Sequence, residues 1–152
     1  MKVGLGPKHM TDTFSPRARK RVMSRITSKN TRPEIDVRKY LYSKGLRYRL
    51  HRKNLPGKPD IVISRIKSVI FVNGCFWHHH DGCKRSNWPK SNKDYWIPKI
   101  ERNIVRDRDN IVRLSSLGWK SITVWECETK NLDVHGQLQR VIQEYFDKDE
   151  NE

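Results

Sequence analysis

The sequence has few hydrophobic residues and no long hydrophobic run. Only 35% of its 152 residues are hydrophobic, and no apolar stretch approaches the length of a membrane span. No basic stretch is amphipathic over many turns, which disfavours binding to an acidic membrane surface. The chain also lacks the hydrophobic segment of a secretory signal. We therefore expect an intracellular, reducing compartment and no membrane partner.

Acidic residues are scarce beside basic ones. The chain has 17 Asp and Glu against 32 Lys and Arg, a formal net charge of +15 at pH 7. Such an excess indicates a polyanionic partner, and nucleic acid is the commonest one. A soluble basic protein without such a partner is the alternative.

Cysteine is rare, but its placement is informative. Two cysteines enclose three consecutive histidines and the third follows a β-rich run, the residues being Cys75, His78, His79, His80, Cys83 and Cys127. Structural zinc sites commonly combine ligands close in sequence with one from a distant element. The pattern favours zinc over three buried thiols, or over one disulfide and an orphan. Spacing alone does not choose among the three histidines.

The length suits one domain with a single core. We expect four segments: a leader at 1–9 that is not part of the fold, a basic DNA-contacting segment at 10–30, a single domain at 31–147 and an acidic tail at 148–152.

Hydrophobic spacing predicts a mixed order of helices and strands. Residues 14–29 form a short helix or an arm, and a capping box with Pro33 in the first turn opens a helix that stops at Gly45. Strands are expected at 46–50, 60–63, 68–72 and 119–125, a long helix at about 94–117, and a final helix that carries Val134, Leu138, Val141, Ile142 and Tyr145.

Three motifs carry a resemblance to a known family. Asp60 begins a strand directly after a proline-bounded loop, where it is either an ordinary turn residue or a metal ligand. The segments Gly57–Asp60, Val69–His78 and Val124–Cys127 resemble, in the same order, the very-short-patch-repair (Vsr) endonucleases. The resemblance runs from about Arg17 through Cys127.

The resemblance implies a fold and an activity. The fold would be α/β and restriction-endonuclease-like, with a mixed central sheet flanked by helices and one structural zinc site. The activity would be that of a bacterial, cytoplasmic enzyme that acts as a monomer on mismatched double-stranded DNA. With Mg²⁺ it would nick one strand 5′ to the thymine of a T:G mismatch.

The resemblance also implies roles for individual residues. Asp60 and the backbone carbonyl of Val72 would bind Mg²⁺, and His78 would activate the attacking water. Glu34 would support the catalytic centre, although its place in the capping box suggests a competing structural role. The zinc ligands would be Cys75, His80, Cys83 and Cys127, and a flexible Gly82 would absorb a gap one residue longer than the family pattern.

Asn73 departs from the family, which has a histidine before the Gly-Cys pair. An asparagine side chain can hydrogen-bond phosphate or water but cannot exchange a proton near neutral pH. We therefore list Asn73 among the candidate catalytic residues without a proton-transfer role.

Candidate DNA contacts lie around the zinc segment and in the basic segment. The resemblance implies that Phe76, Trp77 and Trp96 insert beside the mismatch, with Met23 in the minor groove. The basic residues expected on phosphates are Arg17, Arg19, Lys20, Arg21 and Arg25.

Two other functions remain open. An HNH nuclease also combines histidine, asparagine and zinc, but the distance to Cys127 and the strand start at Asp60 argue against it. A catalytically weak or inactive zinc-stabilised DNA-binding module explains the charge and the cysteines, yet leaves Asp60 and His78 without a purpose.

Overall fold

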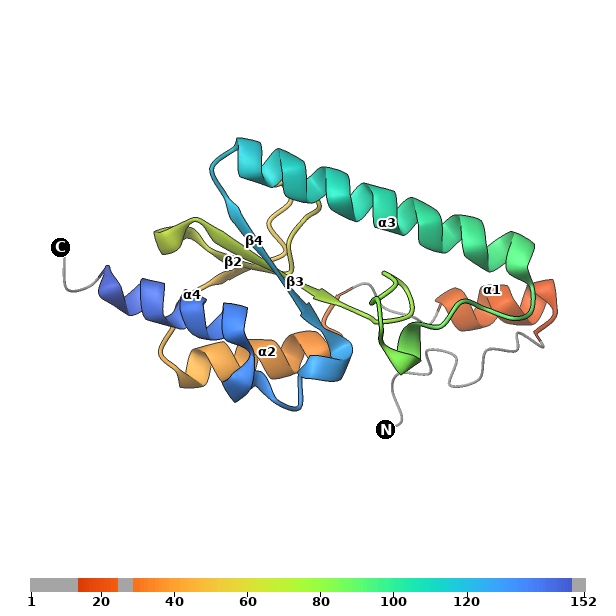
Figure 1. The fold of residues 1–152 in the computed structure, drawn as a ribbon, viewed down its shortest axis with the longest axis horizontal. Coiled ribbons are helices and arrows are strands. Elements are labelled where there is room, and N and C mark those ends of the chain that lie inside the picture. Colours follow the sequence, from red (N-terminus) through yellow and green to blue (C-terminus); the bar gives the residue numbers. More distant parts are fainter. Residues whose placement is uncertain (1–13, 25–28, 149–152) are drawn as a thin grey trace.

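A four-stranded mixed sheet forms the centre of the computed structural model, which describes residues 14–24 and 29–148 (Figure 1). Its strands lie in the order β1 (Arg49–Leu50), β2 (Ile61–Ile63), β3 (Ser68–Asn73) and β4 (Lys120–Trp125). The first three are antiparallel neighbours, and β3 and β4 run parallel. This arrangement confirms the predicted mixed α/β fold.

The described residues contain four α-helices, which are α1 (Pro16–Ser24), α2 (Arg32–Ser43), α3 (Lys93–Ser116) and α4 (Gly136–Asp147). Of these, α2, α3 and α4 pack on the sheet. Helix α3 lies along one face and provides the crossover between β3 and β4, while α2 and α4 cover the other face (Figure 1). Among the described residues, no helix combines the length and apolar character that crossing a membrane requires. The predicted leader, Arg25 and residues 149–152 of the predicted tail lie outside the described residues.

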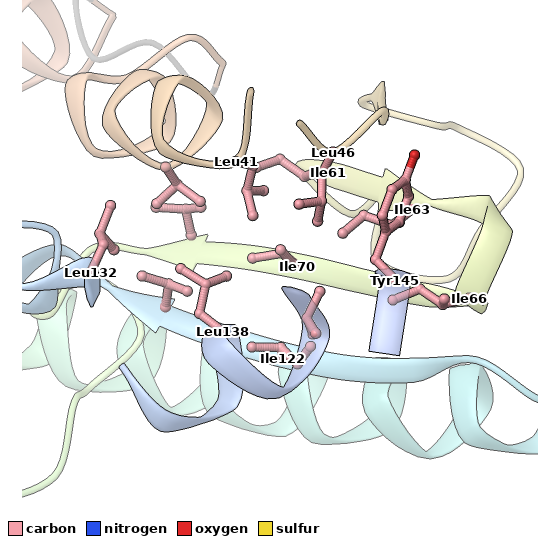
Figure 2. Close-up of a cluster of buried hydrophobic side chains, with 14 residues drawn as sticks. Leu41, Leu46, Ile61, Ile63, Ile66, Ile70, Ile122, Leu132, Leu138 and Tyr145 are labelled. Atoms are coloured by element: carbon pink, nitrogen blue, oxygen red, sulfur yellow. The ribbon is translucent and has the colours of Figure 1, made fainter. Parts of the chain in front are cut away.

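The main hydrophobic core lies between the sheet and the pair α2 and α4 (Figure 2). Its fully buried members include Leu41 of α2, Ile61 and Ile70 of the sheet, and Leu138 of α4. A smaller cluster with Val62, Val69 and Leu114 joins the opposite face of the sheet to α3. Burial on both faces explains why β2 and β3 are continuous hydrophobic runs rather than alternating ones.

Two predicted elements are shorter than expected. The strand predicted at 46–50 comprises only Arg49–Leu50, because the N–H of Leu46 bonds the carbonyl of Leu41 and belongs to the end of α2. Val134 lies before α4 in a short 3₁₀ turn and is 78% exposed. The helix begins only at Gly136, because the side chain of His135 caps the N–H of Leu138.

Candidate functional site

Asp60 directly precedes β2 and is hydrogen-bonded to the neighbouring strand β3. Its Oδ2 accepts the N–H of Val72 at 2.7 Å. The pairing between β2 and β3 ends at Ile61 and Ile70, so this carboxylate replaces the missing strand partner of Val72. Burial raises the pKa of Asp60 to about 7, although the Val72 N–H and the nearby His78 both favour the ionised form. Asn73, which is half-buried, ends β3 next to this point.

Glu34 is almost fully buried in the first turn of α2. Its N–H is capped by the Thr31 hydroxyl at 3.4 Å, and its Oε2 accepts the Asn30 N–H at 2.9 Å and an Arg38 N–H at 3.2 Å. The same Oε2 lies 3.6 Å from His51 Nε2. The Glu34 carboxylate thus contacts both the backbone before α2, through the Asn30 N–H, and the His51 ring. Its structural role at the helix start does not prevent it from facing the Asp60 cluster.

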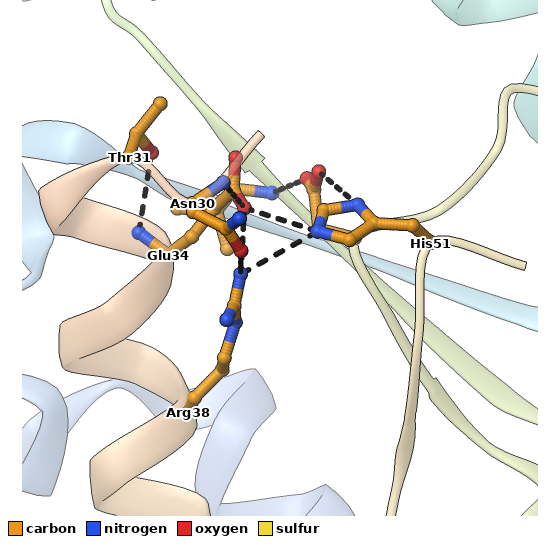
Figure 3. Close-up of polar contacts among 7 residues, drawn as sticks. Asn30, Thr31, Glu34, Arg38 and His51 are labelled. Carbon is orange, nitrogen blue, oxygen red and sulfur yellow. Dashed lines mark hydrogen bonds and ion pairs between the residues drawn. The ribbon is translucent and has the colours of Figure 1, made fainter. Parts of the chain in front are cut away.

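His51 was not among the residues that the sequence predicted for the site. It follows β1, and its N–H donates to the carbonyl of Asp60 at 3.2 Å. Figure 3 shows its ring among Asn30, Glu34 and Arg38. The β1–β2 register, which pairs Leu50 with Ile61, places His51 opposite Asp60. The alternating pattern of residues 46–50 predicts a strand that ends next to His51. To place His51 beside Asp60, the sequence would also have had to show which strand pairs with it.

The carboxylates of Glu34 and Asp60 and the imidazole of His51 suit a divalent cation. One ligand atom from each lies within 4.8 Å of the others. Oxygen and imidazole ligands bind Mg²⁺, Mn²⁺ and related ions. A desolvated carboxylate with a raised pKa is stabilised in its ionised form by such an ion. The donor set therefore fits the metal that the sequence analysis expected here.

His78 is paired with a carboxylate that the sequence analysis missed. Its Nδ1 lies 2.6 Å from Oδ2 of Asp107, which is on α3. A second contact from α3, from the Asn103 amide to the Trp77 carbonyl at 2.8 Å, holds the same loop. Asp107 falls on the helix face marked by Ile100 and Ile104, so the helical period was its signal. The pairing fixes the ring and leaves Nε2 to accept a proton.

The second polar cluster gathers every cysteine of the chain. Ligand atoms of Cys75, His80, Cys83 and Cys127 all lie within 4.8 Å of one another. His80 Nδ1 is 3.4 Å from the Cys127 sulfur, and its ring stacks on Trp125 with centroids 4.3 Å apart. His80 is thus the histidine that the structure groups with the three cysteines. All three cysteines are free, so there is no disulfide.

The loop that carries these residues is closed by its own backbone. Hydrogen bonds run from the His80 N–H to the Cys75 carbonyl at 3.0 Å and from the Cys83 N–H to the His80 carbonyl at 3.1 Å. Gly82 has φ +73, a left-handed conformation that glycine adopts at little cost.

The three cysteine thiols of this cluster would repel one another as thiolates, so a bound cation is needed to stabilise their deprotonated forms. Burial raises the pKa of Cys75 to about 12 and raises that of Cys127. The Cys83 sulfur raises both pKa values further, whereas the hydrogen bond with the Cys75 thiol lowers the pKa of Cys127. A three-cysteine, one-histidine set is a common structural zinc environment, and four protein ligands leave no position for water. The residues present therefore fit a structural metal site.

The predicted aromatic wedge forms a cluster of rings. Phe76, Trp77 and Trp96 have centroids 5.3 to 5.5 Å apart, and Met23 of α1 packs against them. Phe76 and Trp96 are buried and Trp77 is half-buried. The Lys99 ammonium lies 5.4 Å from the centre of the Trp77 ring. Met23 of α1 thus contacts the cluster formed by Phe76, Trp77 and Trp96.

A mixed sheet flanked by helices, with a group of carboxylates and an imidazole that could hold a divalent cation, is consistent with a restriction-endonuclease-like fold. A sequence profile of the family described as DNA mismatch endonuclease Vsr matches residues 11–85. The chain belongs to the Vsr family.

Relatives cover most of the chain. It is 52% identical over 123 residues to the Type II nicking enzyme V.XorIIP of Xanthomonas oryzae, covering 81% of this chain and 90% of that protein. It is 47% identical over 139 residues to the nicking enzyme V.NmeAIP of Neisseria meningitidis, covering 91% and 99%. It is 39% identical over 118 residues to the DNA mismatch endonuclease Vsr of Escherichia coli, covering 78% and 75%. The chain is therefore a DNA-nicking endonuclease.

Proposed function

We propose that this endonuclease nicks one strand of double-stranded DNA 5′ to the thymine of a T:G mismatch and so starts very short patch repair. The observation that carries the proposal is the group of Glu34, His51 and Asp60, whose ligand atoms lie within 4.8 Å of one another. His78 lies in the loop that follows β3, the strand whose Val72 N–H bonds Asp60. The Escherichia coli relative, named as a mismatch endonuclease, supports the choice of substrate.

Asp60 and the Val72 carbonyl are the proposed Mg²⁺ ligands. In a β-strand the N–H and C=O of one residue point to the same edge. The Val72 N–H bonds Asp60, so its carbonyl lies on the Asp60 side as well. The bound ion would polarise the scissile phosphate and stabilise the leaving 3′ oxygen.

His78 is the proposed general base. Asp107 holds a proton on Nδ1, so Nε2 is the nitrogen that accepts a proton from the attacking water. Asn73, at the end of β3, would hold water or phosphate by hydrogen bonds, because its amide does not take up the proton.

Zinc is the proposed metal of the Cys75, His80, Cys83 and Cys127 cluster. Cys75 follows β3 and Cys127 follows β4, so the ion would clamp the loop of His78 to the sheet. Its task would be structural, because the chemistry belongs to the other cluster.

We expect the purified protein to carry one zinc, and Cys83→Ser to lose it. Binding of a structural zinc is coupled to folding, so the melting temperature should fall by roughly 10 °C or more. Elemental analysis and thermal unfolding measure the two effects. Asp81→Ala, at an exposed position in the same loop, is the control and should keep both zinc and stability. Fully folded, active protein without zinc would refute the site.

Recognition is proposed to use the ring cluster and α1. The exposed Arg17, Lys20 and Arg21 would contact phosphates. The Phe76, Trp77 and Trp96 rings, with Met23, would enter the duplex beside the mismatch. Because Phe76 and Trp96 are buried, insertion requires α1 or the zinc loop to move. A mismatch lowers the cost of unstacking, so the insertion discriminates.

A nicking assay tests the proposed substrate. We expect Mg²⁺-dependent cleavage of a T:G duplex at one site 5′ to the thymine, and at least about 10²-fold slower cleavage of the paired T:A duplex. Trp77→Ala should lower affinity for the T:G duplex by roughly 1–3 kcal/mol more than for the paired control. Lys20→Ala should weaken both duplexes about equally. Equal cutting of paired and mismatched DNA would contradict the mismatch proposal, and no cutting at all would favour the inactive DNA-binding module.

A further inference from the structure

His51 is held in an unusual backbone conformation at the edge of the Asp60 cluster. Its φ is +46, in the left-handed region that residues other than glycine rarely adopt. The turn follows the last residue of β1, and it leaves the side chain only 16% exposed between two carboxylates. Such a conformation persists only where surrounding contacts hold it.

The two ring nitrogens face different carboxylates. Nδ1 is 3.9 Å from Asp60 Oδ1, and Nε2 is 3.6 Å from Glu34 Oε2. Both distances exceed that of a direct hydrogen bond, about 2.7–3.2 Å. In an octahedral Mg²⁺-sized ion with bonds of about 2.1 Å, adjacent ligands lie about 3.0 Å apart and opposite ligands about 4.2 Å apart. The 3.9 Å separation of His51 Nδ1 from Asp60 Oδ1 lies between these two values, so a small shift of either side chain lets both atoms reach one ion.

We propose that His51 Nδ1 is a ligand of the divalent cation at Asp60, and that Glu34 accepts the Nε2–H of the same ring. This inference rests on the proposed metal role of Asp60. Histidine ligands of metals characteristically donate their second ring N–H to a carboxylate, which fixes the ring and its tautomer. Glu34 lies on the correct side of His51 for that task, and it is itself held by Asn30 and Arg38.

Arg38 gives the cation-free site a different hydrogen-bond pattern. One of its terminal nitrogens, Nη2, lies 3.4 Å from His51 Nε2, 3.2 Å from Glu34 Oε2 and 2.6 Å from Asn30 Oδ1. When Nε2 accepts from Arg38, the ring proton is on Nδ1. Binding of the cation at Nδ1 places that proton on Nε2, which then donates to Glu34. Arg38 keeps its contacts with Asn30 and Glu34, so cation binding removes only its 3.4 Å contact with His51.

A nitrogen ligand changes which cations the site prefers. Mg²⁺ favours oxygen ligands, whereas Mn²⁺ and later transition metals accept imidazole readily. The proposed ligand set therefore binds Mn²⁺ more tightly than Mg²⁺. Removal of His51 should lower Mn²⁺ affinity about 10-fold or more and Mg²⁺ affinity much less.

The test is pulsed electron paramagnetic resonance of Mn²⁺ bound to zinc-loaded protein without DNA. We expect the spin-echo modulation of a coordinated imidazole nitrogen in the wild type, and its loss in His51→Gln and His51→Asn. Asparagine tolerates positive φ and so guards against misfolding. His78→Gln is the matched control and should keep the signal. Asp60→Asn should remove the bound Mn²⁺ itself, which shows that zinc-site exchange is not its source.

The outcomes separate this inference from the proposed function. Mn²⁺ that requires Asp60 but shows no nitrogen signal, or a signal that survives in both His51 variants, would overturn the ligand role of His51 and leave the Asp60 site intact. Mn²⁺ binding that is indifferent to Asp60→Asn would overturn the proposed metal role of Asp60, and this inference with it.

Discussion

Asp60→Asn is expected to reduce single-turnover nicking by about 10³-fold or more and, at the same time, to stabilise the protein. The amide keeps the size of the side chain but is a weaker cation ligand than the carboxylate. Transition-state stabilisation by the metal is worth several kcal/mol, which corresponds to that loss in rate. Binding to mismatched DNA should change little, because Asp60 acts on the chemistry.

The stabilisation follows from the pKa of Asp60, which the fold raises from 3.8 to about 7. The folded protein therefore holds this proton more tightly than the unfolded chain does. The resulting stability is complete below the unfolded pKa and is lost as the pH rises through about 7. Asparagine removes that loss. At pH 8 we expect the variant to be more stable by about 1–3 kcal/mol, with a much smaller difference at pH 4.

Urea unfolding at both pH values measures this effect. The buffer contains no Mg²⁺ and no chelator, because a chelator would remove the zinc proposed at the cysteine cluster. Asp109→Asn, an exposed carboxylate on α3, is the control and should change neither rate nor stability appreciably. A variant that is destabilised at pH 8, or one that still nicks at the wild-type rate, would contradict the assignment of Asp60.

Asp107→Asn is expected to slow nicking by about 10²–10⁴-fold with little effect on DNA binding. The 2.6 Å contact between Asp107 Oδ2 and His78 Nδ1 holds the ring in the tautomer that leaves Nε2 as the acceptor. An asparagine can present its amide N–H to Nδ1 instead, which places the ring proton on Nε2 and blocks proton uptake.

Single-turnover rates at saturating enzyme isolate the chemical step from binding. The positioning role predicts that His78→Ala is as slow as Asp107→Asn and that the double variant is little slower than either, because the two residues act as a unit. Independent, multiplying losses would instead show that Asp107 acts apart from His78. Asp109→Asn again serves as the control on the same helix.

The sequence analysis proposed site residues that belong to short local motifs. It missed the residues from other elements that contact them in the structure. Asp60, His78 and the cysteines are marked by motifs in which neighbours constrain one another. Asp107 and His51 carry no such mark, because an aspartate in a charged helix and a histidine after a strand are ordinary residues. Asp107 takes its position from the packing of α3 on the loop that carries Trp77 and His78, and His51 takes its position from the β1–β2 register.

The fold was predictable wherever periodicity was strong. The long helix was expected at about 94–117 and observed at Lys93–Ser116, since a sustained apolar face and the Gly118 stop define it. Two predictions were wrong beside helix ends. The strand after α2 is shorter than predicted and comprises only Arg49–Leu50, and Val134 is exposed before α4 instead of belonging to that helix. There, capping hydrogen bonds decide where an element stops, and hydrophobic spacing does not encode them.

The parallel pairing of β3 with β4 also sets the order in which the protein can mature. Asn73 meets Trp125 only after the chain has passed through the whole of α3. Parallel, long-range pairing is slow to form because the intervening loop must close first. A growing polypeptide on the ribosome therefore has Asp60 and His78 long before Cys127 emerges. The zinc proposed at the cysteine cluster would therefore close the loop of His78 onto the sheet late in folding, and chains that end before Cys127 would not assemble the proposed site.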